Sequence, residues 1–112
     1  MEENEFTELN DIQRLDELLS HSGEQPVILF KHSDTCGISA RAYREMTKLE
    51  QRIALVTVQK ARALSNEIES RFALPHETPQ VLIVREGKLT WSASHFRITA
   101  DAVNRAVEEA AQ

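Results

Sequence analysis

The chain has 112 residues, of which 41% are hydrophobic and 28% charged, and its net charge is −5. This size and balance predict one globular domain over residues 1–112, and the scattered basic residues offer no broad surface for nucleic acid. No segment approaches the length of a membrane span, and the acidic start lacks the basic and apolar parts of a targeting signal. We therefore expect a cytoplasmic protein with no membrane partner.

The chain begins with a predicted helix and a predicted strand. Four aliphatic residues recur at helical spacing within residues 10–23, with Asn10 or Thr7 available as the N-cap and Gly23 to end the turn. The run VILF at residues 27–30 follows, and it is typical of a strand that is buried on both faces.

The middle of the chain predicts two more helices around a strand. A second helix is expected to begin at Cys36, because an apolar stripe follows this residue at helical spacing. The sequence IALVTVQ at residues 53–59 predicts another buried strand, and residues 61–72 place apolar residues at intervals of four, which predicts a third helix. Residues 73–79 contain two prolines and are expected to form a loop.

The last third of the chain predicts a hairpin and a closing helix. Residues 80–94 contain two strands joined at Glu86-Gly87, and Thr99 caps the final helix. The order is α-β-α-β-α-β-β-α, in which the first two strands form a parallel pair and the hairpin adds antiparallel strands. This order is similar to the thioredoxin-like fold, an α/β fold with a central mixed four-stranded sheet flanked by helices.

Cys36 is the only cysteine, so any disulfide that it forms joins it to another molecule. A free thiol is normal for a reducing compartment. At the start of a helix, unpaired backbone N–H groups and the helix dipole stabilise a thiolate. The polar HSDT before Cys36 and the small Gly37 after it indicate an open turn, which favours a reactive thiol over a small buried hydrophobic residue.

Two residues after Cys36 carry alternative interpretations. Gly37 leaves room for a second sulfur to approach, or it serves only the geometry of the turn. Ser39 lies one helical turn after Cys36 and can donate a hydrogen bond to a thiolate, or it is only a helix-start residue. Because Ser39 cannot form a disulfide, a mixed disulfide at Cys36 requires an outside thiol for its resolution.

Thr78-Pro79 lies directly before the predicted hairpin. In a thioredoxin-like domain this position faces the cysteine and holds a cis peptide, which leaves the backbone of the preceding residue free to pair with a bound peptide or thiol cofactor.

A metal site is the alternative that the histidines suggest. His32, His76, His95 and Cys36 could nominally supply ligands, but zinc sites usually carry more cysteines at closer spacing, so we expect no metal. A Cys-His hydrolase is less favoured still, because no third orienting group is identifiable.

Three separated motifs resemble the monothiol bacilliredoxin family, small bacterial proteins that use bacillithiol. The motifs are T-C-G-I-S at residues 35–39, H-E-T-P-Q at residues 76–80 and W-x-x-S-H-x-x-I-T at residues 91–99. They occur in the family's order, and the resemblance covers nearly the whole chain.

The resemblance implies a thiol-disulfide oxidoreductase of redox homeostasis and oxidative stress, which removes bacillithiol from S-bacillithiolated proteins through a Cys36 mixed disulfide. Bacillithiol is then the co-substrate, S-thiolated client proteins are the partners, and a monomer or weak dimer is expected. Bacillithiol carries a glucosamine and a malate, so its carboxylates need donors, for which Arg62 is a candidate. Ser94 and His95 are further candidates for binding the cofactor. The residues expected to support Cys36 are Thr35, Gly37, Ser39, Thr78 and Pro79.

Gly37 departs from the family pattern, which commonly has proline, and this leaves other functions open. The sequence C-G-I-S also resembles the C-G-F-S of monothiol glutaredoxins that carry iron-sulfur clusters, although the Gly-Gly-Asp of those proteins is absent. It further resembles glutaredoxin-linked arsenate reductases, but their arginine after the serine is Ala40 here, and Arg41 comes one residue late. A redox sensor or adaptor that is only modified at Cys36 is a third class.

Overall fold

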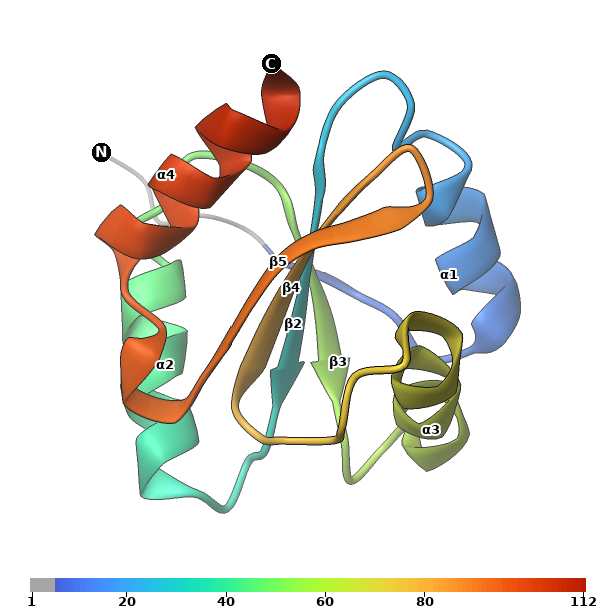
Figure 1. Ribbon diagram of the computed structural model, residues 1–112. Helices are drawn as coiled ribbons and strands as arrows, with labels where there is room; N and C mark the ends of the chain where they lie inside the picture. Colours follow the sequence, from blue (N-terminus) through green and yellow to red (C-terminus); the bar gives the residue numbers. More distant parts are fainter. Residues whose placement is uncertain (1–5) are drawn as a thin grey trace.

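The computed structural model describes residues 6–112, so the first five residues of the predicted 1–112 domain lie outside the described residues. These residues form a five-stranded sheet with helices on both faces (Figure 1). The elements in chain order are β1 (Phe6–Glu8), α1 (Ile12–Leu19), β2 (Val27–His32), α2 (Gly37–Met46), β3 (Ile53–Thr57), α3 (Arg62–Phe72), β4 (Gln80–Arg85), β5 (Lys88–Ser94), the short 3-10 helix η1 (His95–Arg97) and α4 (Ala100–Ala111).

The sheet has the strand order β1-β3-β2-β4-β5, which confirms the thioredoxin-like fold class. β2 and β3 are parallel, whereas β4 is antiparallel to both β2 and β5. The prediction of four strands was wrong, because β1 adds a fifth strand parallel to β3, with Phe6 opposite Ile53. β1 is three residues long and mostly exposed, so its sequence has no apolar pattern that marks a strand.

β2 is longer than the predicted run 27–30. It continues through Lys31 to His32, and all six of its residues are buried. Two residues that can carry charge therefore lie inside the sheet, immediately before the loop that leads to Cys36.

Hydrogen bonds and backbone angles within a few residues define the helix ends and the hairpin turn. The N-cap of α1 is Asp11, which accepts the Arg14 N–H at 2.9 Å, so the predicted caps Asn10 and Thr7 were wrong. α1 also ends before the predicted Gly23. Thr99 caps α4 as predicted, accepting the N–H of Ala102 at 3.1 Å. At the hairpin turn, Glu86 and Gly87 have φ values of 54° and 75°, which suits a tight two-residue connection.

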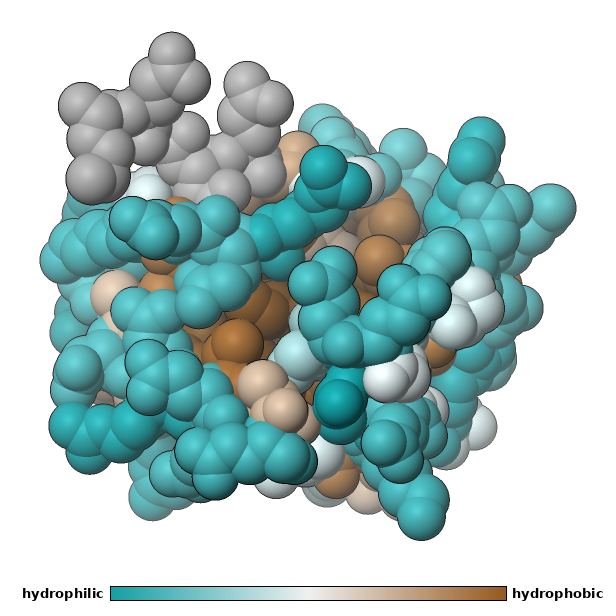
Figure 2. Space-filling view, turned by 90° about the horizontal axis from the view of Figure 1, so that it is seen from above, coloured by the Kyte–Doolittle hydropathy of each residue, from teal (hydrophilic) through white to brown (hydrophobic). Residues whose placement is uncertain are grey.

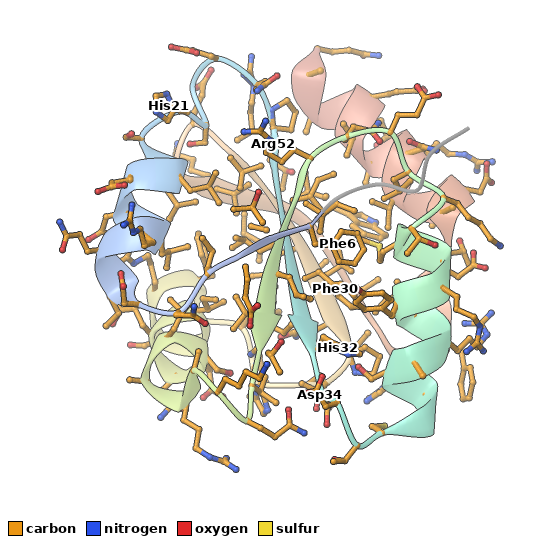
Figure 3. All side chains as sticks on the ribbon, turned by 180° about the vertical axis from the view of Figure 1, so that it is seen from behind. Phe6, His21, Phe30, His32, Asp34 and Arg52 are labelled. Atoms are coloured by element: carbon orange, nitrogen blue, oxygen red, sulfur yellow. The ribbon has the colours of Figure 1, made fainter. Side chains whose placement is uncertain are left out.

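Hydrophobic side chains fill both faces of the sheet. Because strand residues alternate, Phe30 faces the side of α2 and α4 while Leu29 faces the side of α1 and α3 (Figure 1). On the α2 side, Phe6 packs edge-on against Phe30, whose ring lies 5.6 Å from that of His32, and Figure 3 shows these side chains along one strip. The strip leads from β1 toward the end of the sheet that holds Cys36.

That end of the molecule collects the loops that matter for function. β2 and β3 finish there, and β4 begins there, so the segments 33–36, 58–61 and 73–79 all run along the lower edge in Figure 1. Figure 2 views the opposite end, where mostly hydrophilic residues surround a hollow with hydrophobic side chains in it. Within residues 6–112, no helix has the length and apolar character needed to cross a membrane.

Candidate active site

Cys36 is the N-cap residue of α2. Its backbone is extended, with φ −109° and ψ 125°, and its half-buried side chain makes no capping hydrogen bond. The first hydrogen bond of the helix runs from the Ala40 N–H to the Cys36 carbonyl at 3.0 Å. Cys36 therefore directly precedes first-turn N–H groups that have no helical partner, at the positive end of the helix dipole.

Ser39 is fully buried and contacts the loop before Cys36. Its Oγ accepts the Ser33 N–H at 2.9 Å and lies 2.8 Å from Nδ1 of His32. No hydrogen bond joins it to the Cys36 sulfur among the described residues. The expected donation from Ser39 to a thiolate is thus replaced by a link that holds the loop to the helix.

His32 is 8% exposed, and its ring packs against the rings of Phe30 and Tyr43, which also pack against each other. Burial lowers the pKa of His32, against the opposing effects of the nearby Asp34 carboxylate and of the hydrogen bond with Ser39. A neutral ring with its proton on Nε2 accepts the Ser39 hydroxyl and directs Nε2–H toward Asp34, whose Oδ1 is 3.5 Å away (Figure 3). His32 thus links the Ser39 hydroxyl on one side of its ring to the Asp34 carboxylate on the other.

Gln59, in the turn after β3, holds the same loop from the other side. Its Nε2 donates to the hydroxyl oxygens of Ser33 at 2.7 Å and Thr35 at 3.2 Å, and its Oε1 accepts the Asp34 N–H at 3.3 Å. The predicted supporting residue Thr35 is therefore part of a network with Gln59.

This network was not predicted from the sequence. His32 was considered as a nominal metal ligand and as the histidine of the arsenate reductase pattern, although its place just after a predicted buried strand was a usable signal. Gln59 had no local signal, because its partners lie 24–26 residues away.

Thr78, Pro79, Ser94 and His95 form a second group at this end of the sheet. The Thr78-Pro79 peptide bond is cis, and Pro79 is buried. The Pro79 carbonyl accepts the His95 N–H at 3.0 Å, and His95 has a φ of 55°. The structure therefore brings the candidate residues Ser94 and His95 beside the proline loop. The backbone of Thr78 makes no hydrogen bond with any of the described residues.

Gly37 and Arg62 occupy exposed positions. A Cβ atom at Gly37 would meet nothing within 4 Å, so the fold itself does not require glycine there. Arg62 is the first residue of α3 and lines a pocket with Ser65 and His76, and Cys36 does not line that pocket. The guanidinium of Arg41 lies 5.5 Å from the Phe96 ring centre.

The histidines do not gather around Cys36. His32 contacts Ser39, His76 contacts Ser65 at 3.4 Å, and His95 lies 3.8 Å from Glu77. Within residues 6–112, no group of three or more His, Cys, Asp or Glu side chains is placed to hold a metal ion.

Comparisons with known proteins identify the family. The model of the family described as monothiol bacilliredoxin BrxC matches residues 7–103. A solved thioredoxin-fold protein, for which an oxidoreductase role has been suggested, is 28% identical with a TM-score of 0.83, over 90% of this chain and 92% of that one.

More distant structures show the fold. Thioredoxin f from spinach chloroplast is 19% identical with a TM-score of 0.73, over 98% of each chain. A structure from work on thiol resolution in the yeast mitochondrial 1-Cys peroxiredoxin through glutathione and thioredoxin systems is 16% identical, with a TM-score of 0.75, over 93% of this chain and 94% of that one. With the family match over most of the chain, the resemblance seen in the sequence is confirmed: the protein belongs to the monothiol bacilliredoxin family and is a thiol-disulfide oxidoreductase.

Proposed function

We propose that the protein removes bacillithiol from S-bacillithiolated proteins through a mixed disulfide at Cys36. The observation that carries this proposal is the position of the only cysteine as the N-cap of α2, with a half-buried side chain that makes no capping hydrogen bond, in a chain of the bacilliredoxin family. Thiol-disulfide exchange needs an activated thiol and access to the sulfur, and the N-cap position and partial exposure of Cys36 support this chemistry.

In the first step the Cys36 thiolate attacks the bacillithiol sulfur of the client's mixed disulfide. A new disulfide forms between Cys36 and bacillithiol, the old disulfide breaks, and the client leaves as a thiolate that takes a proton from water. The first-turn N–H groups of α2 stabilise the attacking anion before the reaction.

In the second step a second bacillithiol resolves the enzyme. Its thiolate attacks the bacillithiol sulfur on Cys36, which releases the Cys36 thiolate and oxidised bacillithiol. Ser39 cannot replace this thiol, because it has no sulfur and its hydroxyl is bound to His32 and Ser33. The mixed disulfide at Cys36 therefore persists until an outside thiol arrives.

Residues at the same end of the sheet as Cys36 support binding of the small thiol. The free backbone of Thr78 offers a donor and an acceptor, Ser94 and His95 lie beside the proline loop, and Arg62 offers a cation. The proposed clients are S-thiolated proteins in the cytoplasm. The protein itself is proposed to act as a single domain, as a monomer or weak dimer.

The test is transfer of the small thiol followed by intact-protein mass spectrometry. Reduced protein is mixed with a test protein that carries bacillithiol, and in parallel with the same protein carrying glutathione. We expect Cys36 to gain the mass of one bacillithiol while the test protein is released, with little transfer from the glutathione substrate. Absence of transfer from either substrate would refute the proposal.

Cys36→Ser is the decisive variant. It should abolish transfer completely, since no other residue of the chain can form a disulfide. The variant should keep the fold, because the Cys36 side chain makes no capping hydrogen bond, and circular dichroism checks this. Transfer by a folded Cys36→Ser protein would disprove the assignment of the nucleophile.

A further inference from the structure

Two buried polar side-chain atoms in the sheet lack hydrogen-bond partners among the described residues. Lys31 in β2 is fully buried and its Nζ donates to no described residue, while the buried Oε1 of Gln80 in β4 accepts from none. The two residues lie directly opposite each other in the antiparallel register. They alternate with Phe30 and Val81, which face α2, so both face the side of α3.

The Lys31 ammonium group has unused capacity for an anion. Burial lowers the pKa of Lys31 to about 8, against the opposing charge of Glu69, so the group remains mostly charged at pH 7. Glu69 forms no ion pair with it and instead accepts the His76 N–H at 2.9 Å. A buried cation without a hydrogen-bonded partner is unfavourable, and an anion that reaches it gains strongly.

A pocket of about 180 Å³ lies next to this position. It is lined by Val58, Arg62, Ser65, Asn66 and His76. The Val58 N–H donates to the carbonyl of His32, the residue after Lys31, at 2.9 Å. Gln80, which lies opposite Lys31, donates from Nε2 to the Pro75 carbonyl at 3.1 Å, and the next residue along the chain is His76. Burial first, and then the charge of Lys31, lower the pKa of His76. The pocket therefore lies near the Lys31–Gln80 pair, at the same end of the sheet as Cys36, although Lys31 is not one of its lining residues.

We propose that this pocket binds the carboxylate groups of the low-molecular-weight thiol, with Lys31 as their buried cationic partner and Arg62 at the rim. The His76 ring, which contacts Ser65 at 3.4 Å, turns aside to admit them. Gln80 directly follows Pro79, so a ligand held here extends past the proline loop toward Cys36. This inference rests on the proposed function, because the malate part of bacillithiol supplies the carboxylates.

Direct binding is measured by calorimetry with L-malate as the probe. Inorganic phosphate, at equal ionic strength, is the comparison anion. Lys31→Met should weaken L-malate binding about tenfold or more, the loss expected for one charge-assisted hydrogen bond. Gln80→Glu should cause a similar loss, because the new carboxylate pairs with Lys31. Lys60→Met, which removes an exposed lysine, is the matched control and should bind like the native protein. Equal L-malate binding by all four proteins, or phosphate binding as tight as L-malate, would overturn the proposal.

Kinetics separate this pocket from the proposed function. The test protein carries either bacillithiol or 2-mercaptoethanol, an uncharged thiol. Lys31→Met should lower kcat/KM about tenfold or more for the bacillithiol substrate and leave the 2-mercaptoethanol substrate almost unchanged. Equal losses on both substrates would refute the pocket while leaving the function intact. L-malate binding through Lys31 without any bacillithiol transfer would refute the proposed function alone.

Discussion

Lys31 places an ammonium group inside the sheet, and its effect on stability can be measured. Replacing a buried charge by an apolar side chain of similar size is often stabilising, so Lys31→Met should raise the free energy of unfolding by about 1–4 kcal/mol at pH 7. Urea denaturation gives this value. The exposed Lys60→Met should change it little, and a large loss of stability in Lys31→Met would contradict the unpaired state of the ammonium group.

The same residue should give a pH dependence with a defined sign. The pKa of Lys31 is lowered from 10.5 to about 8, so between these values the unfolded chain binds a proton that the folded protein does not. Stability therefore rises with pH across this window. The difference in unfolding free energy between the native protein and Lys31→Met should shrink as the pH rises from 8 toward 10.5. A constant difference would show that Lys31 does not titrate in this range.

Ser39 joins α2 to the loop before Cys36 through its hydrogen bonds to Ser33 and His32. Ser39→Ala leaves the buried Ser33 N–H and Nδ1 of His32 without a partner, so it should lower the free energy of unfolding by about 2–4 kcal/mol. The matched control is Ser70→Ala on the exposed surface of α3, for which a change within about 0.5 kcal/mol is expected. Similar values for the two variants in urea denaturation would mean that the Ser39 contacts add little stability.

The turn between β3 and α3 supports the active-site loop through one side chain. Gln59→Ala removes the hydrogen bonds to Ser33, Asp34 and Thr35, so the loop should become more mobile and transfer roughly threefold to tenfold slower. Stability should change by less than about 1 kcal/mol, because Gln59 is exposed. Hydrogen exchange at residues 33–36 and single-turnover transfer test this. Gln13→Ala on the exposed face of α1 is the control. Unchanged hydrogen exchange at residues 33–36 in Gln59→Ala would show that Gln59 does not stabilise the loop.

The elements that were predictable from the sequence are those with a periodic apolar pattern or a strong turn signal. α3, α4 and the β4-β5 hairpin are examples. β1 was not predictable, because its place depends on backbone pairing with β3 rather than on its own three residues. The cap of α1 was misplaced for the same reason, since the pairing extends to the Leu9 N–H and keeps the chain extended up to Asp11.

The active site shows the same division. The position of Cys36 before a helix follows from local sequence, and so does the loop with Thr78-Pro79. The partners of Ser39 and Gln59 depend on how the fold brings distant segments together. Lys31 was hidden because a lysine after VILF suggests the end of a strand, whereas the sheet continues around it.

The molecule as a whole places two hydrophobic clusters on opposite faces of one sheet and its chemistry at one end. The Cys36 loop and the proposed carboxylate pocket lie near each other there, but on opposite faces of the sheet. His32 lies on the α2 side, where Ser39 of α2 contacts it, whereas Lys31 and Gln80 lie on the α3 side. This separation explains why variants of the pocket are expected to affect substrate choice without disturbing the thiol.

A chain with a single cysteine exchanges with small thiols in a one-to-one stoichiometry. Exchange of Cys36 with an oxidised small thiol releases one reduced thiol, so the modified fraction depends on the ratio of the two to the first power. A protein that closes an internal disulfide releases two reduced small thiols. The oxidised fraction of such a protein therefore also depends on the total concentration of the small thiol. Raising the whole bacillithiol pool about tenfold at a fixed ratio should leave the modified fraction of Cys36 unchanged by mass spectrometry. The modified fraction of Cys36 therefore reports the ratio of oxidised to reduced small thiol and does not depend on their total concentration.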